Sequence, residues 1–148
     1  MEITSPVITI ARLLNSQAAA ICNRDIAAAA ANYASDVVIF DVVGPLQHQS
    51  GNSSVMKRLQ EWMGSFARDT PVLFEITDPT IEASGDHGFS YSLNRIRASL
   101  GSSGELDMFW RETLAWRMID GEWKIVHAHS SVPFNPSTGM ASTGLKPA

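Results

Sequence analysis

The chain is poor in cysteine, in basic residues and in long apolar segments. Its single cysteine, Cys22, excludes an internal disulfide and favours a reducing compartment. The 11 lysine and arginine residues are scattered and the formal net charge is -4, so the clustered positive charge that binds nucleic acid is missing. No apolar run approaches the roughly 20 residues of a membrane span, and the N-terminus lacks a basic region followed by an apolar one. We therefore predict a cytoplasmic protein that has neither nucleic acid nor a membrane as partner.

Two groups of catalytic motifs are missing as well. The sequence has no G-x-S-x-G, the strand-turn-helix signature of a serine nucleophile. It also has no glycine-rich loop of the kind that surrounds phosphate groups. These absences argue against covalent serine catalysis and against nucleotide binding.

The remaining composition is that of one folded domain. With 148 residues, 45% of them hydrophobic and 18% charged, the chain can bury a core without disulfides or metals. The periodic apolar patterns lie within residues 1–134, whereas residues 135–148 are mostly small or polar. We expect a single domain followed by a flexible C-terminal tail.

The apolar patterns predict both helices and strands. Apolar residues recur every three to four positions in 7–23 and 53–66, and an alanine-rich stretch at 26–34 adds a short helix. β-branched or alternating runs predict strands at 37–43, 71–77, 80–83, 89–99, 107–119 and 122–133. Three helices in the N-terminal half and a run of strands after them predict an α+β fold. In such a fold a curved antiparallel sheet wraps around the helices, and its concave side holds a pocket.

The last two strands are predicted to form a hairpin over the Asp120-Gly121 turn, because an Asp-Gly pair adopts positive φ at little cost. Residues opposite each other in a hairpin share a face of the sheet. In a regular pairing, one face carries three successive pairs: Leu114 with His127, Glu112 with His129, and Trp110 with Ser131. This face changes from apolar near the turn to polar further out, which is typical of a pocket wall.

Three stretches resemble the NTF2-like superfamily, which includes ketosteroid isomerases and SnoaL-type polyketide cyclases. They are the Arg24-Asp25 break, the run YASDVVIFDVVGPLQHQSG and the ending DGEWKIVHAHSSVPF. The ending is similar to the SnoaL-like and calmodulin-kinase-association-like branches in particular. The resemblance implies a cone-shaped α+β barrel with a deep pocket, a homodimer packed through the sheet, and chemistry that uses no metal or other cofactor.

The same resemblance assigns Asp41 to the position of the proton-shuttling base of ketosteroid isomerases. Asp41 also shares a strand face with aliphatic residues, and burial makes a carboxylate a better proton acceptor near neutral pH. The alternative is an acid at a strand end that binds loop amides. The tyrosine of those isomerases falls near Gln17 and their second acid near Ala115, so steroid isomerisation by that machinery is not expected.

His127 and His129 form an H-x-H pair on one face of a strand. We predict that His129 donates a proton or a hydrogen bond to a ligand carbonyl, and that Glu112 orients its ring. Two alternatives stay open. His129 and Glu112 satisfy each other inside the sheet, or the two histidines bind a divalent ion with Glu112 as third ligand.

Aromatic and polar residues complete the predicted site. Trp116 is assigned to the core, because it lies near the turn between apolar positions. The predicted ligand contacts are Trp62, Trp110, Glu112, His127, Ser131, Asn94 and Tyr91. Arg111 and Thr113 fall on the opposite face, unless a β-bulge exchanges the two faces.

Two classes of function fit this pattern. The first is an enzyme whose pocket takes a small apolar compound with a carbonyl or hydroxyl group. Its chemistry is isomerisation, cyclisation or dehydration, with Asp41 as base and His129 as acid. The second is a non-catalytic module that binds a ligand or drives oligomerisation. A cavity bordered by Asp41 and His129 favours the enzyme, and an exposed apolar sheet favours the module.

Overall fold

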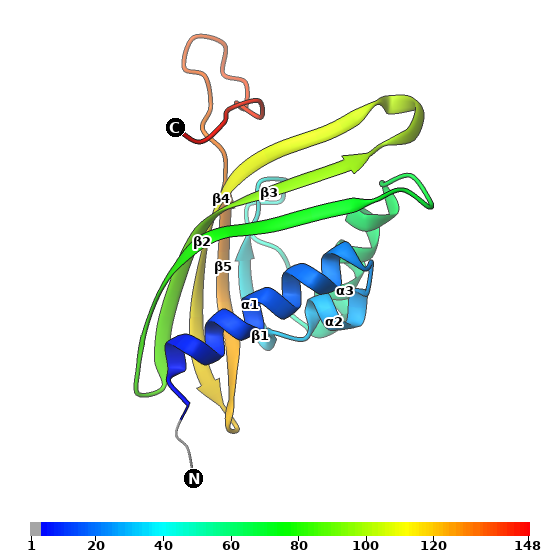
Figure 1. Ribbon diagram of the computed structural model, residues 1–148. Coiled ribbons are helices and arrows are strands. Elements are labelled where there is room, and N and C mark those ends of the chain that lie inside the picture. Colours follow the sequence, from blue (N-terminus) through cyan, green and yellow to red (C-terminus); the bar gives the residue numbers. More distant parts are fainter. Residues whose placement is uncertain (1–3) are drawn as a thin grey trace.

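A computed structural model describes residues 4–148, in which three α-helices pack on one side of a five-stranded sheet (Figure 1). In chain order the elements are α1 (Pro6–Cys22), α2 (Ile26–Ala30), β1 (Tyr33–Phe40), α3 (Asn52–Gly64), β2 (Val72–Ser84), β3 (His87–Ser99), β4 (Glu105–Ile119) and β5 (Glu122–Ser131). A 3₁₀ turn at Gly101–Ser103 joins β3 to β4. The predicted α+β fold, with a curved sheet around three helices, is confirmed.

The sheet has the strand order β1-β5-β4-β3-β2. Strands β2 to β5 are antiparallel neighbours, as predicted, whereas β1 pairs with β5 in parallel, so the sheet is mixed. A parallel pair needs a long crossover connection, and the chain from α3 through β4 supplies it. The sheet bends around the helices, and α1 crosses its concave side (Figure 1). We call the concave side the inner face and the opposite side the outer face.

The boundary between α2 and β1 differs from the predicted one. The helix ends at Ala30, and the strand begins at Tyr33, which pairs with Ile125 of β5. Strand pairing thus overrides the helix propensity of the alanine-rich stretch, as tertiary contacts often do. In β2 the register shifts between Thr77 and Thr80, because Pro79 lacks the backbone N–H that a regular ladder needs.

The β4–β5 hairpin contains a β-bulge. Trp116 lies opposite Ile125, as in a regular hairpin, but the next pair joins Ala115 to His127, so Val126 is an extra residue on β5. Side chains of a strand alternate between its faces, and one extra residue therefore moves every later side chain to the other face. The part of β5 that follows the bulge is reversed relative to a regular hairpin.

The bulge overturns the predicted cross-strand pairs. Glu112 lies opposite Ser130, and His129 lies opposite Thr113. Ser131 lies opposite Arg111 rather than Trp110. Glu112 and His129 therefore lie on opposite faces of the sheet, and the predicted orientation of the His129 ring by Glu112 is wrong.

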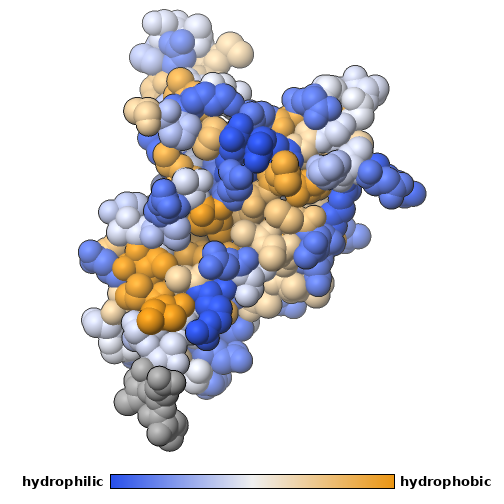
Figure 2. Space-filling model, viewed as in Figure 1, coloured by the Kyte–Doolittle hydropathy of each residue, from blue (hydrophilic) through white to orange (hydrophobic). Residues whose placement is uncertain are grey.

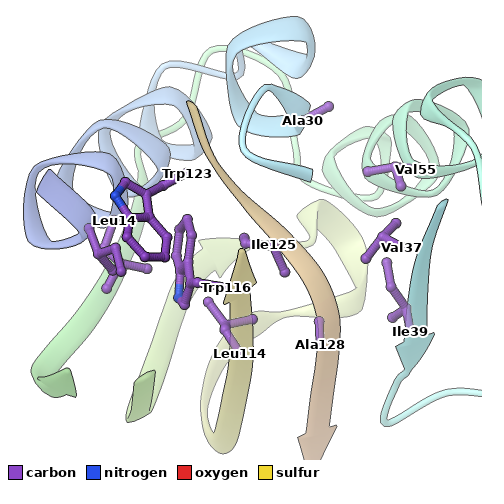
Figure 3. Packing of buried hydrophobic residues seen from close by; sticks show 11 residues of the cluster. Leu14, Ala30, Val37, Ile39, Val55, Leu114, Trp116, Trp123, Ile125 and Ala128 are labelled. Carbon is purple, nitrogen blue, oxygen red and sulfur yellow. The ribbon is translucent and has the colours of Figure 1, made fainter. Parts of the chain in front are cut away.

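Two apolar clusters fill the inner face. The first joins α1, β1 and α3 to β4 and β5, and Figure 3 shows Leu14 of α1 against Trp116 and Trp123. Its buried members are Ile10, Leu14, Ala30, Val37, Ile39, Val55, Leu114, Trp116, Trp123, Ile125 and Ala128. The second joins the helices to β2 and β3 through Ala20, Ile21, Ala29, Met63, Phe66, Val72, Phe74, Ile96 and Ala98. Along β4, Trp110 packs against the second cluster and Leu114 belongs to the first, so Glu112 lies between them.

Some apolar side chains lie on the surface. On the helical side, apolar surface covers the N-terminal part of α1, where Val7 and Ile8 are exposed (Figure 2). On the outer face, Phe89, Tyr91 and Leu93 form an exposed row along β3. No helix within residues 4–148 is long and apolar enough to cross a membrane.

The C-terminal segment forms a short loop after β5. Phe134 makes a β-bridge with Ala141, and Lys146 Nζ lies 3.3 Å from the Asp107 carboxylate on β4. Hydrogen bonds from Arg95 and Lys146 hold the pKa of Asp107 well below its usual range. The flexibility of this segment stays a prediction.

Candidate functional site

Four polar side chains form a hydrogen-bonded group between the two apolar clusters. We call Glu112, Asn94, Ser92 and Ser130 the interior polar cluster. Asn94 Nδ2 donates to Glu112 Oε1 at 3.0 Å, and Ser130 Oγ donates to Glu112 Oε2 at 3.1 Å. Ser92 Oγ donates to Asn94 Oδ1 at 2.7 Å, and Asn94 is fully buried. The cluster therefore holds one carboxyl group in a fixed place on the inner face.

Glu112 is the titratable member of this cluster. Burial raises its pKa above the ordinary glutamate range, and the negative charge of Asp41 adds to the rise. The hydrogen bonds from Asn94 and Ser130 act in the other direction, because they stabilise the carboxylate. A carboxyl group with a raised pKa exchanges protons closer to neutral pH than a solvated one does.

Asp41 lies at the end of β1 and forms an ion pair with Arg58 of α3. Both side chains are about one quarter exposed. The other carboxylate oxygen of Asp41 accepts a hydrogen bond from the Val42 backbone N–H at 2.7 Å. The predicted base is therefore a paired carboxylate, and one of its oxygens binds a loop amide, as the alternative interpretation expected.

A phenol also belongs to the interior. Gln17 of α1 donates from Nε2 to the Tyr33 hydroxyl at 3.2 Å. Burial raises the pKa of Tyr33 well above its usual range, and the charge of Glu112 is the next cause. The resemblance assigned Gln17 to the tyrosine position of ketosteroid isomerases, and here the phenol comes from β1 instead.

Aromatic rings from three elements border this region. Trp62 of α3 and Trp110 of β4 meet edge to face with ring centroids 6.3 Å apart. Phe74 of β2 lies 5.8 Å from Trp110. The two tryptophans that the sequence analysis assigned to a pocket wall are thus neighbours on the inner face. Of these two, Trp110 lies on β4, two residues before Glu112.

The two histidines lie on the outer face. The His127 ring nitrogen Nδ1 is 2.7 Å from the Val38 carbonyl oxygen. Phe40 of β1 packs edge to face against His127 and His129, at 4.8 Å and 5.5 Å between ring centroids. The alternative of a metal site with Glu112 as third ligand is therefore wrong, because Glu112 is on the inner face. Residues 4–148 contain no group of three or more His, Cys, Asp or Glu side chains placed to hold a metal ion.

Asp41 and His129 nevertheless border the same surface depression, which we call the rim hollow. It is an open hollow of about 600 Å³ at the end of β1. The loop residues Val42, Gly44, Pro45, Leu46 and Gln47, together with Phe40, complete its lining. Asp41 thus faces this hollow and also acts electrostatically on Glu112 and Tyr33.

Two other predicted ligand contacts lie away from the interior. Ser131 accepts a hydrogen bond from Arg111 Nε at 3.1 Å on the outer face. Tyr91 stacks on Phe89 with ring centroids 6.4 Å apart and is half exposed. The structure brings neither side chain to Glu112.

Sequence reasoning missed Arg58 and Ser130. Arg58 lies three residues after Val55 and four before Trp62, so a charged residue on an otherwise apolar helix face was the available signal. Ser130 was hidden by the bulge. The available signal was the spacing of the apolar residues on β5. Trp123 and Ile125 are two positions apart, whereas Ala128 follows Ile125 by three, which breaks strict alternation.

Helices enclosed by a curved mixed sheet are the architecture of NTF2-like proteins. An NTF2-like protein of unknown function from Pseudomonas putida KT2440 is 33% identical, with a TM-score of 0.83 over 95% of this chain and 96% of that chain. A ketosteroid isomerase-like protein from Erwinia carotovora atroseptica SCRI1043 is 18% identical, with a TM-score of 0.69 over 87% of this chain and 97% of that chain. A candidate dehydratase of the NTF2-like family from Streptomyces avermitilis is 15% identical, with a TM-score of 0.69 over 84% and 94%. The last two likenesses show the fold alone.

The family itself follows from the sequence match. The model of the SnoaL-like domain matches residues 10–135. This chain therefore belongs to the SnoaL-like family of NTF2-like proteins, as the quoted motifs predicted. No curated protein matches the sequence.

Proposed function

We propose that the inner face binds a small, largely apolar compound with a carbonyl or hydroxyl group and catalyses proton transfer on it without a cofactor. The reaction class is isomerisation, cyclisation or dehydration. The observation that carries this proposal is Glu112, a carboxyl group with a raised pKa, held by Asn94 and Ser130 between two apolar clusters. Trp62 and Trp110 supply flat apolar surface beside it.

Glu112 is the better proton acceptor of the two interior acids. The carboxylate oxygens of Asp41 are already paired, one with Arg58 and the other with the Val42 backbone N–H. Glu112 has only neutral donors as partners. We assign proton transfer to Glu112. Asp41 acts on the site through its charge, as the ion-pair partner of Arg58.

The rim hollow is the proposed entrance to this region. Asp41 borders the hollow, and its charge contributes to the raised pKa of Glu112, which supports a location of the entrance on the Asp41 side of the interior. His129 borders the hollow from the outer face. We propose that His129 contacts the compound during entry, while the chemistry takes place at Glu112.

Hydrogen exchange at a ketone tests the proposal without knowledge of the natural substrate. A panel of bicyclic and tricyclic ketones is incubated with the protein in D₂O, and loss of the α-proton signal is followed by NMR. Proton abstraction by Glu112 gives an enolate, which takes up a deuteron at the same carbon. We expect acceleration by the wild type, and a loss of roughly 100-fold or more in Glu112→Gln, the usual range for a general base.

Two comparisons make this result specific. Asp41→Asn should lose less activity than Glu112→Gln, because Asp41 acts through charge. If Asp41→Asn loses more, Asp41 is the base that the sequence motif indicated. If no ketone of the panel exchanges faster than in buffer, the acid/base function is refuted.

A second candidate function is supported by the outer face. The exposed row of Phe89, Tyr91 and Leu93 is the feature expected of an oligomerisation module. We propose a homodimer that packs through this row. Sedimentation velocity should show a dimer that Tyr91→Lys dissociates, whereas Leu46→Lys, at an exposed apolar position of a loop, leaves it intact. A monomeric wild type at all concentrations would rule the dimer out.

A further inference from the structure

A chain of hydrogen bonds in the interior starts at a backbone carbonyl group. Asn32 Nδ2 lies 3.0 Å from the Leu13 carbonyl oxygen and 3.3 Å from Gln17 Oε1. A carbonyl oxygen can only accept, so the atom that faces Leu13 must be the amide nitrogen of Asn32. Its second proton is then available for Gln17. The Leu13 carbonyl thus fixes the orientation of the Asn32 amide, and the Asn32 amide in turn fixes the orientation of the Gln17 amide.

The orientation of the Gln17 amide decides which of its atoms faces the Tyr33 hydroxyl. Its Oε1 accepts from Asn32, so its Nε2 faces the Tyr33 hydroxyl, at 3.2 Å, and donates to it. The Tyr33 oxygen is therefore an acceptor in this bond, and its own proton must point elsewhere. Within residues 4–148 the hydroxyl proton has no acceptor at hydrogen-bond distance.

The burial of Gln17 and Asn32 disfavours the reversed orientation of their amide groups. Gln17 and Asn32 are each 6% exposed, so bulk water does not compete for their amide groups. Reversing one amide would place two oxygens or two NH₂ groups face to face, which is costly in a desolvated site. Tyr33 also stays protonated, because burial and the charge of Glu112 raise its pKa. The hydroxyl is a preset donor near Glu112 and Asp41.

We propose that Tyr33 donates this free hydrogen bond to an acceptor oxygen of the bound compound, and that Gln17 and Asn32 are the positioning residues that fix its direction. This proposal rests on the interior site proposed above and narrows its ligand class to compounds that place an acceptor oxygen, such as that of a ketone, at Tyr33. A carbonyl oxygen accepts the Tyr33 proton.

The direction of the chain can be tested without a ligand. The protein has two tyrosines, so the Tyr91→Phe variant leaves Tyr33 as the single source of tyrosine ring signals. In this variant we expect NOEs between the Gln17 side-chain amide protons and the Tyr33 ring protons next to the hydroxyl. If the Gln17 oxygen faces Tyr33 instead, these NOEs are missing, and the proposal is overturned.

A matched pair of probes tests recognition. 1-Tetralone and tetralin have the same bicyclic frame, and only the ketone offers an acceptor oxygen. Binding to the wild type, Tyr33→Phe and Tyr91→Phe is followed by the NMR shifts of the protein. We expect the wild type and Tyr91→Phe to bind tetralone about threefold to tenfold more tightly than tetralin, the range of one hydrogen bond. Tyr33→Phe should bind both equally, with its affinity for tetralin unchanged.

The outcomes separate this proposal from the one on which it rests. If both probes bind the wild type equally, the interior site stands and the role of Tyr33 is refuted. If Tyr33→Phe keeps the preference for tetralone, another donor recognises the carbonyl and the proposal is also refuted. If neither probe binds the wild type, the interior site and the role of Tyr33 are refuted together.

Discussion

The two faces of the β4–β5 hairpin carry titratable side chains in opposite surroundings. On the inner face, Glu112 has neutral donors as partners, lies between two apolar clusters and has a raised pKa. On the outer face, His129 is exposed, packs against Phe40 and borders the rim hollow. Both side chains can carry protons. The comparison teaches that burial and fixed partners, rather than residue type, indicate the place of the chemistry.

The largest expected difference between the faces is in stability. Trp116→Ala should lower the free energy of unfolding by about 3–5 kcal/mol, because it removes a buried ring and leaves a cavity. Trp116 is 1% exposed, and its Nε1 donates to Ser90 Oγ at 2.9 Å. His127→Ala on the outer face should lose about 1 kcal/mol, the worth of one hydrogen bond. Urea unfolding followed by circular dichroism compares the two, and equal losses would contradict the assignment of faces.

A smaller difference is expected in the pH dependence of stability. The folded chain holds the Glu112 proton more tightly than the unfolded chain, because the pKa of Glu112 is raised on folding. As the pH rises through and above the ordinary glutamate range, the unfolded chain loses this proton first, and the wild type loses stability. Each pH unit between the unfolded and folded pKa costs about 1.4 kcal/mol.

The Glu112→Gln variant isolates this effect, because the other carboxyl groups contribute equally to both proteins. As the pH rises, the free energy of unfolding of this variant should increase relative to that of the wild type. Under acidic conditions this difference between the two proteins should become smaller. Thermal or urea unfolding at a series of pH values measures the difference. Parallel profiles of the two proteins would show that Glu112 is not buried as described.

The smallest expected effect belongs to His129. In the exchange assay, His129→Gln should change the rate by no more than about tenfold, because at most one hydrogen bond at the entrance is lost. Glu112→Gln serves as the reference for a full loss. If His129→Gln is as inactive as Glu112→Gln, the chemistry lies at the rim hollow, and the contrast between the faces fails.

The sequence contained enough to predict the family and most of the elements. Local residue patterns determine the Asp120-Gly121 turn, the apolar periodicity of the first helix and the run around Asp41. Such patterns can be recognised without knowledge of the tertiary structure. Trp62 and Trp110, both predicted as ligand contacts, lie edge to face in the structure. The parallel pairing of β1 with β5 was missed, because it joins residues far apart in the chain.

The site was predicted less well than the fold. The sequence named Glu112, Asn94 and Asp41, but it paired Glu112 with His129. The assignment of a side chain to a face depends on the count of residues from the turn, and the one extra residue at Val126 reverses it. No local signal of comparable strength marks such a bulge.

The sequence by itself determined the α+β class, the SnoaL-like family and the residue types available for proton transfer, because composition and short-range pattern encode them. The tertiary structure alone decided which of those residues meet. It placed Glu112 with Ser130, Asp41 with Arg58, and Gln17 with Tyr33. These partners come from different elements, and their meeting follows from strand register and helix packing, which depend on the whole fold.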